Sequence, residues 1–317
     1  ATRAQLRSLE KRGLVRLTEQ EVVRDPFSEA APIERATDIA LTRDQREALD
    51  RIREAQRAGR ADTIVVHGVT GSGKTEIYLR AIQRTIEAGK RALVLLPEIA
   101  LTPQFVAVFR AALGDSVAVQ HSGMTRTQRF DQWRLIRDGR VPVVIGARSA
   151  IFAPIVDLGL IVVDEEHDAS FKQDTGVTYH ARDLAVVLSQ KTDAVLLLGS
   201  ATPSLESLAN AHRDRYQLVR LRERANRRPM PLVERIDLRT HPPDPAAPVS
   251  RYLSPPLQAA IADTVAAGEQ AILFLNRRGF APVVECTNCG HAFDCPHCDI
   301  SLTYHKRGHA ARCHYCD

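Results

Sequence analysis

Short apolar runs alternate with longer amphipathic stretches between residues 41 and 221. The runs are rich in Val, Ile and Leu, as is typical of strands that are buried on both faces. Such strands, separated by helix-length segments such as 76–88, indicate a parallel sheet that is covered by helices on both sides. The predicted strands span residues 63–68, 91–97, 117–122, 141–146, 158–165 and 194–200. We therefore expect an α/β fold for residues 41–221.

The first 40 residues have a different pattern. A helix with spaced leucines, a glycine break and two short alternating segments fill residues 1–25, and this order is typical of the last helix and wing of a winged-helix DNA-binding domain. A solvated amphipathic helix followed by a hairpin fits the spacing equally well. Residues 26–40 contain two prolines and little periodicity, so we predict a linker there. In residues 1–25, the spaced leucines are Leu6, Leu9 and Leu14, the glycine break is Gly13, and the two alternating segments are 15–18 and 21–24.

Residues 222–254 are rich in proline and arginine and predict an extended linker. Its arginines, with the preceding Arg220, form a basic run that would suit phosphates, although a solvated linker surface is the commoner meaning of such a run. Residues 255–285 then contain one amphipathic helix (257–268) and one apolar strand (270–277), which we interpret as the start of a second α/β lobe. The basic run at the start of the linker consists of Arg220, Arg222, Arg224, Arg227 and Arg228.

Composition places the chain among ordinary globular proteins. It has 317 residues, 44% of them hydrophobic, which suggests about two domains with sizeable cores. The net charge of +5 is compatible with a nucleic-acid partner and is weak evidence by itself. The chain begins at Ala1, and neither a leader nor a bilayer-length apolar run is present, so we expect a cytoplasmic fragment without a membrane partner.

A glycine-rich segment follows the first predicted strand of the lobe and precedes a helix. Glycines there allow positive φ and close approach, so that backbone N–H groups can point at phosphate oxygens. Lys74 would neutralise the β- and γ-phosphates of ATP, and Thr75 would bind Mg²⁺. The alternative is a surface turn with an exposed lysine. The predicted ATP-binding loop consists of Gly68, Val69, Thr70, Gly71, Ser72, Gly73, Lys74 and Thr75.

Two further motifs lie at strand ends. Asp164 and Glu165 end the strand 158–165, where a carboxylate can hold Mg²⁺ and its neighbour can act as the base for the attacking water. Ser200 and Thr202 follow the strand 194–200. In isolation, the acids fit an exposed turn and the hydroxyl residues fit a local cap. The order of the three motifs resembles that of the superfamily-two helicases, in which the last one couples nucleotide state to nucleic-acid binding.

All six cysteines lie near the carboxyl end of the chain in three C-x-x-C pairs. Each pair can supply two thiolates from a tight turn, so that two pairs complete one tetrahedral zinc site. Disulfides or redox-active thiols are the alternative, and nearby histidines are possible substitute ligands. The candidate metal ligands are Cys286, Cys289, Cys295, Cys298, Cys313 and Cys316, and the histidines are His291, His297, His305, His309 and His314.

A set of motifs in fixed order gives a closer resemblance. The motifs are GVTGSGKTE, LLPEIALTPQ, GARSAIFAP, DEEHD, YHARDLA, GSATPSLES and FLNRRGFAP, followed by the cysteine pairs. Together they resemble the bacterial replication-restart helicases of the PriA (primosomal protein N′) family. The resemblance covers nearly the whole chain and implies a RecA-like helicase lobe, with a partial winged helix before it and a zinc module after it.

The resemblance also implies roles for individual residues. Gln45 would read the adenine, and the segments 97–104 and 146–149, which include Arg148, would contact the DNA backbone. The loop after DEEHD would sense single-stranded DNA, with base stacking on its rings. Anchoring of these rings in the core is the alternative. The loop residues are Phe171, Lys172 and Tyr179, with Val177 where some relatives are expected to carry another ring.

The family pattern further implies two interleaved zinc ions. Residues 286–317 would then hold one complete site, made by the last two pairs, while the first pair would await ligands beyond Asp317. Without those ligands, we expect the first pair to be disordered or mispaired.

The implied activity is ATP-dependent 3′ to 5′ DNA unwinding that acts at stalled or branched replication forks and initiates primosome assembly. Implied partners are forked and single-stranded DNA, primosome proteins and single-strand-binding protein, in a bacterial, nucleoid-associated setting. Since most of the second lobe is absent from the sequence, we expect ATP binding with little turnover. A DNA-binding or assembly module without helicase activity, or another superfamily-two repair or restriction translocase, is the competing interpretation.

Overall fold

The computed structural model describes most of the chain and divides it into two compact units, residues 1–229 and 230–317. The described residues are 2–18, 24, 39–114, 117–226, 228–244, 253–274, 284, 286, 288–297, 300–305 and 310–313. Among them, no helix is both long and apolar enough to cross a membrane.

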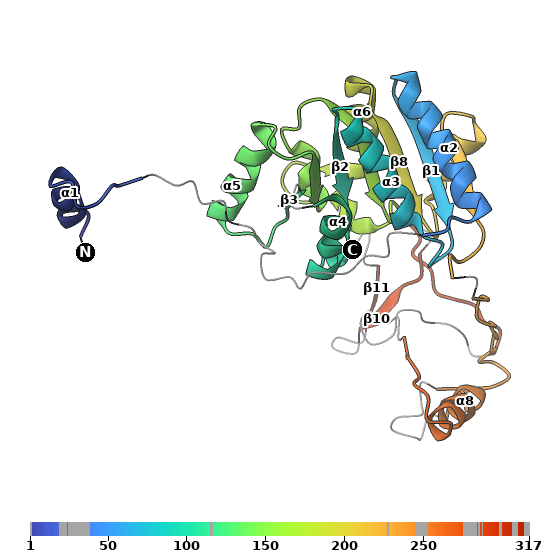
Figure 1. The fold of residues 1–317 in the computed structure, drawn as a ribbon. Coiled ribbons are helices and arrows are strands. Elements are labelled where there is room, and N and C mark those ends of the chain that lie inside the picture. The colour runs from blue at the N-terminus through green and yellow to red at the C-terminus, as the bar shows by residue number, and fades with distance from the viewer. Residues whose placement is uncertain are drawn as a thin grey trace. The chain divides into compact units, whose positions relative to one another are not determined.

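A seven-stranded parallel sheet organises the first unit (Figure 1). Its strand order is β3-β4-β2-β5-β8-β1-β9. The strands are β1 (Asp62–Gly68), β2 (Arg91–Leu95), β3 (Val117–Gln120), β4 (Val143–Gly146), β5 (Leu158–Asp164), β8 (Val195–Ser200) and β9 (Gln217–Leu221). The parallel α/β fold expected from the apolar runs is confirmed, and β9 is an additional strand that the pattern did not predict.

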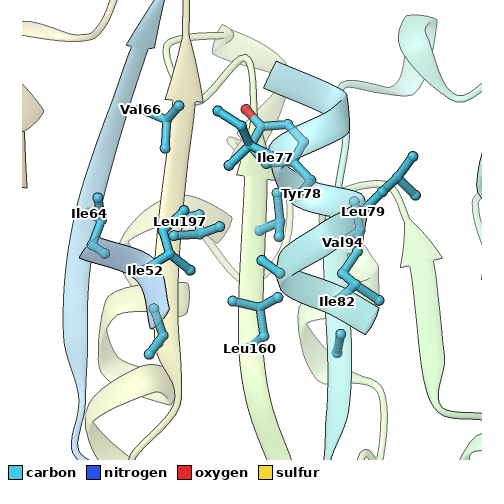
Figure 2. Close-up of a cluster of buried hydrophobic side chains, with 14 of the residues drawn as sticks. Ile52, Ile64, Val66, Ile77, Tyr78, Leu79, Ile82, Val94, Leu160 and Leu197 are labelled. Atoms are coloured by element: carbon cyan, nitrogen blue, oxygen red, sulfur yellow. The ribbon is translucent and has the colours of Figure 1, made fainter. Parts of the chain in front are cut away.

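Helices cover both faces of this sheet. One hydrophobic cluster joins α2, α3 and α4 to one face, and a second joins α5 and α6 to the other. Figure 2 shows part of the first cluster, where side chains of α3 pack on those of the strands. The helices are α2 (Arg43–Ala58), α3 (Lys74–Glu87), α4 (Pro103–Leu113), α5 (Arg126–Arg137), α6 (Ala181–Thr192) and α7 (Leu205–His212).

Hydroxyl residues begin four of these helices. The side chains of Thr42, Thr102, Thr125 and Ser204 accept a backbone N–H from the first turn of α2, α4, α5 and α7. The predicted helix at 76–88 is α3, which begins two residues earlier because Gly73 adopts a left-handed conformation and directs the chain from the loop into the helix. Short elements between the strands are η1 (Glu98–Ala100), η2 (Arg148–Phe152), η3 (Ala169–Phe171), β6 (Lys172–Gln173) and β7 (Tyr179–His180).

The first residues form the predicted helix without the predicted first strand of a wing. Helix α1 (Arg3–Lys11) has a capping box at Thr2, whereas residues 15–18 are not a strand. Their intended partner, 21–24, lies outside the described residues apart from Arg24, as does most of the predicted linker at 26–40. A strand requires a hydrogen-bonded neighbour, and none is described for 15–18.

The second unit contains α8 (Pro255–Ala266) and a small antiparallel hairpin of β10 (Thr303–His305) and β11 (Ala310–Arg312). Helix α8 confirms the amphipathic helix predicted at 257–268. The strand predicted at 270–277 is wrong for residues 270–274, which form no strand, and the remainder lies outside the described residues. Apolar side chains there are exposed because no described strand pairs with this segment.

Candidate functional site

Three neighbouring strands bring the predicted nucleotide motifs together. The glycine-rich loop follows β1, the DEEH motif follows β5, and the GSAT motif follows β8, which lies between the other two. Asp164 is opposite Gly199 in the β5–β8 register, and His67 is opposite Ser200 in the β1–β8 register. Because the strands are parallel, all three motifs lie at the same edge of the sheet, where ligands bind in α/β folds.

The glycine-rich loop requires glycine for two different reasons. Gly71 and Gly73 have φ of 79° and 80°, in the region that other residues avoid. Gly68 has no such φ, but a Cβ there would lie 2.4 Å from the Ser72 hydroxyl oxygen. The loop is therefore shaped as a backbone cradle that leads into the 14-residue helix α3.

Lys74 lies across this cradle. Its ammonium donates to the Gly68 carbonyl at 3.2 Å and lies 3.8 Å from a Glu165 carboxylate oxygen. Its side chain is only 10% exposed. A cation at the N-terminus of a helix suits a polyphosphate.

Gln45 fastens the cradle to α2. Its side-chain oxygen accepts the Thr42 backbone N–H at 2.8 Å, and its amide nitrogen donates to the Ser72 carbonyl at 2.8 Å. The side chain is buried, and a Cβ on Gly73 would collide with it. In this conformation, the amide stabilises the loop from behind, and the adenine contact stays a prediction.

The segment after β9 packs on the cradle instead of leaving the lobe. Val69 donates its N–H to Leu221 O at 3.2 Å, and the Ala225 N–H donates to Gly71 O at 2.9 Å. The Arg222 N–H is bound by the Asp44 carboxylate at 2.8 Å. The linker predicted from residue 222 thus begins later, since the first unit extends to Pro229.

Two carboxylates face the cradle from β5. Burial, followed by the charge of Glu165, raises the pKa of Asp164, whose carboxylate accepts the Tyr78 hydroxyl at 2.9 Å. Glu165 has φ of 47°, a strained value for this residue. Two adjacent acids form an oxygen donor set that fits Mg²⁺, and a divalent cation would offset their mutual repulsion. The hydroxyl of Thr75, which follows Lys74 in α3, is the further oxygen ligand predicted from the sequence.

The GSAT motif contacts the DEEH motif through a histidine. The Ser200 hydroxyl lies 2.8 Å from His167 Nδ1, and the Thr202 hydroxyl lies 3.4 Å from Nε2. His167 Nδ1 also lies 3.7 Å from Glu165. This histidine links the coupling hydroxyls to the predicted base, a role that the sequence analysis did not assign.

A buried ion pair lies behind the same motif. Glu166 is fully buried and accepts Arg182 Nη1 at 3.3 Å, the Ser204 N–H at 2.6 Å and the Ser207 hydroxyl at 3.0 Å. A buried carboxylate is tolerated only with such partners. The pair joins α6 and the start of α7 to the motif. Its sequence signal was the arginine of YHARDLA, which was noted only as part of a resemblance.

A cavity of about 540 Å³ lies beyond β3 and β4, next to the loop that follows DEEHD. Arg148 Nη1 donates to Ser170 O at 3.1 Å and also to Lys172 O. Tyr179 contacts Phe152 edge to face with ring centroids 5.1 Å apart. The cavity is lined by Glu98, Gln120, His121, Ser122, Arg129, Trp133, Ala147, Arg148, Ser149, Phe152, Ser170, Gln173 and Tyr179.

The loop residues have different environments. Phe171 is fully buried in the core, so the expectation that its ring stacks on a base is corrected by this structure, and the alternative of a core anchor holds. Lys172 is exposed and pairs with Asp174 at 3.1 Å. Tyr179 lines the cavity, and Val177 is exposed. Sequence reasoning missed Trp133 and Arg129, whose spacing gave no distinctive motif, and assigned no role to Phe152, although it lies in the motif GARSAIFAP.

The cysteine region contains two tight turns. The Cys286 N–H donates to His291 O at 2.8 Å, and the Cys295 N–H donates to Ile300 O at 2.8 Å. Backbone N–H groups of Cys289 and Asn288 lower the pKa of the Cys286 thiol. Cys295 and Cys313 are buried, whereas Cys298 and Cys316 lie outside the described residues. Within the described part of the chain, no three potential metal ligands gather, so the zinc sites stay predictions.

Residues 42–211 match the model of the DEAD/DEAH box helicase family. The chain belongs to this family. The match spans the glycine-rich loop, DEEH and GSAT, and the sheet is the RecA-like lobe that the family implies. Residues 295–317 of the chain match the PriA DNA helicase Cys-rich region domain.

Relatives of the chain confirm the resemblance recognised from its motifs. It is 44% identical to replication restart protein PriA of Bacillus subtilis over 314 residues, which are 99% of the chain and 38% of that relative. Its identity to PriA of Haemophilus influenzae is 46%, over 80% of the chain and 34% of the relative. The chain thus spans less than two fifths of the length of these relatives. A solved structure of RecG bound to a three-way DNA junction is 24% identical, with a TM-score of 0.45 over 62% of the chain and 25% of that structure.

Proposed function

We propose that the chain is the ATP-binding lobe of a DNA helicase that restarts replication. The convergence of the three motifs at the ends of β1, β5 and β8 carries this proposal, because nucleotide binding and its coupling to nucleic acid require them in one place. The similarity to PriA proteins supports a role in replication restart. We further propose, from the family resemblance, unwinding in the 3′ to 5′ direction at stalled or branched forks, followed by primosome assembly.

The residues of the cradle divide the chemistry of ATP hydrolysis. The loop from Gly68 to Thr75 binds the phosphates through those backbone N–H groups that make no hydrogen bond within the protein, which excludes the N–H groups of Val69 and Ser72. Lys74 neutralises charge on the β- and γ-phosphates. Asp164 and Thr75 would hold Mg²⁺, which would supply further charge neutralisation. Glu165 orients and deprotonates the attacking water. His167 and the hydroxyls of Ser200 and Thr202 transmit changes at this centre.

The nucleic-acid side of the lobe lies at the 540 Å³ cavity. Arg148, Arg129 and exposed Lys172 supply positive charge, while Tyr179 and Trp133 supply rings for stacking. We assign single-stranded and forked DNA to this surface. We also assign contacts with the DNA backbone to the segments 97–104 and 146–149. Primosome proteins and single-strand-binding protein are the further partners that we propose, in the bacterial cytoplasm with the nucleoid.

Zinc is the second proposed metal. Cys295, Cys298, Cys313 and Cys316 form one site in a unit that matches the PriA Cys-rich region. Cys286 and Cys289 belong to a second site in the longer family pattern. Their tight turn, with Gly290 at φ of 73°, is compatible with a thiolate pair that faces a metal.

Binding of fluorescent (mant-labelled) ATP by this chain tests the nucleotide assignment. Wild type is expected to bind, and Lys74→Ala is expected to lose about tenfold or more in affinity because a buried charge-assisted contact is removed. Turnover of the chain alone is expected to be slow, since the family pattern takes a transition-state arginine from a second lobe. Equal binding by both proteins contradicts the assignment, and fast turnover contradicts the second expectation. Forked-DNA stimulation of ATP hydrolysis by a chain as long as the relatives tests the helicase activity.

A further inference from the structure

A tyrosine occupies the hydrophobic face of the helix that follows the phosphate loop. Tyr78 is fully buried among the aliphatic side chains that join α3 to the sheet (Figure 2). A hydroxyl in such surroundings is costly unless it makes a hydrogen bond. The Tyr78 hydroxyl donates to a carboxylate oxygen of Asp164 at 2.9 Å.

Gly199 creates the space in which this bond forms. A Cβ at that position would lie 1.6 Å from the Tyr78 hydroxyl oxygen and 3.2 Å from the Asp164 carboxylate. Gly199 and Asp164 are also partners in the β5–β8 register. The hydroxyl therefore lies against the backbone of the GSAT strand at Gly199 where it donates to the carboxylate of the DEEH strand.

We propose that Tyr78 is a positioning residue for the Mg²⁺ carboxylate. The hydroxyl restrains rotation of the Asp164 carboxylate and links it to α3, the helix whose first residues bind the phosphates. Mg²⁺ demands near-ideal ligand geometry, and partners of metal ligands outside the coordination sphere typically alter metal affinity by about 10–100-fold. This inference rests on the proposed function, because it assumes that Asp164 holds Mg²⁺.

A purely structural hydroxyl would have a different consequence. Phenylalanine fills nearly the same volume, so Tyr78→Phe preserves the packing of α3 on the sheet. If the hydroxyl serves stability alone, its loss changes the melting temperature and leaves the metal requirement of nucleotide binding unchanged. If it positions Asp164, the metal requirement itself changes.

The experiment titrates Mg²⁺ against mant-ATP binding by the whole chain. For Tyr78→Phe, the half-saturating Mg²⁺ concentration is expected to rise about tenfold, whereas affinity in EDTA stays within about twofold of wild type. Tyr216→Phe is the matched control, since it removes a hydroxyl from a half-buried tyrosine that packs with the opposite face of the sheet. This control is expected to match wild type in both measurements.

The possible results distinguish failure of the proposed role of Tyr78 from failure of the proposed function of the chain. Absence of nucleotide binding by wild type overturns the proposed function and the inference with it. Normal binding with an unchanged Mg²⁺ requirement in folded Tyr78→Phe overturns the inference alone. Should circular dichroism show that this variant is unfolded, wild type labelled with 3-fluorotyrosine decides. A ¹⁹F resonance that shifts with nucleotide and Mg²⁺, and not with nucleotide alone, supports the inference, and absence of any such resonance overturns it.

Discussion

At the scale of single residues, local spacing identified the cradle but not the side chains that support it. Gly71, Gly73 and Lys74 were predictable because their spacing reflects a backbone requirement. Tyr78 was not, because a tyrosine on an apolar helical face looks like any other core residue. Phe171 was assigned to the DNA surface because sequence cannot show whether a loop ring faces inward or outward.

Asp164 provides a prediction about charge and stability. Its pKa is raised in the folded chain by burial and by Glu165, so the folded chain retains the proton more strongly than the unfolded chain does. The free energy of unfolding therefore falls as the pH rises from 3.8 to the raised pKa of Asp164. Above that pKa, the ionised carboxylate destabilises the folded chain by a constant amount. Asp164→Asn removes this charge while it keeps an acceptor for Tyr78. Without metal and nucleotide, the variant is expected to melt a few degrees higher than wild type at pH 7.

Thermal melts in EDTA at several pH values check this expectation. The gain should shrink as the pH is lowered toward 3.8, because wild type then loses the same charge. A variant that melts below wild type at pH 7 would show that the ionised carboxylate stabilises the fold. Mant-ATP binding, measured in parallel, should lose its dependence on Mg²⁺.

At the scale of elements, strands that are apolar on both faces were predicted well, including β3 at one edge of the sheet, whereas β9 at the other edge was not. Strand β9 has exposed Arg220 between buried Val219 and Leu221, which obscured it among the basic residues around it. The predicted strand at 270–277 had a suitable pattern, but residues 270–274 find no described partner. Pairing partners are a property of the whole sheet, which short-range pattern does not contain.

The segment after β9 gives a prediction about the cradle. Ala225→Pro removes the N–H that donates to Gly71 O at 2.9 Å. The glycine-rich loop then loses this hydrogen bond to the segment after β9. Since such a hydrogen bond contributes about 0.5–1.5 kcal/mol, affinity for mant-ATP is expected to fall about 2–10-fold. Ala225→Ser keeps the N–H and should bind like wild type. Unchanged affinity in the proline variant would show that this contact does not shape the loop.

At the scale of the whole molecule, the two units separate the two predicted chemistries. Every residue of the phosphate cradle belongs to residues 1–229, and every cysteine belongs to residues 230–317. The order of motifs made this division predictable. The set of zinc ligands was harder to predict, because four sulfurs come together only when the loops between the cysteine pairs fold.

Removal of zinc should therefore affect one unit. Metal analysis is expected to find about one zinc ion per chain, and chelation is expected to make residues 286–317 susceptible to proteolysis, because small zinc modules depend on the metal for folding. Affinity for mant-ATP should stay within about twofold, since no cysteine lies in the first unit. Zinc far below one per chain, or proteolysis that is unaffected by chelation, would contradict the assignment of the last two cysteine pairs.

The contact of Tyr78 with Gly199 also has an evolutionary consequence. A residue larger than glycine at 199 cannot coexist with a tyrosine in this rotamer at 78, because the added carbon would overlap the hydroxyl. The two positions should therefore change together during divergence, although they belong to motifs that sequence comparison treats separately. Lineages that lose the tyrosine would be free to acquire alanine or serine at 199, and lineages that keep it would not.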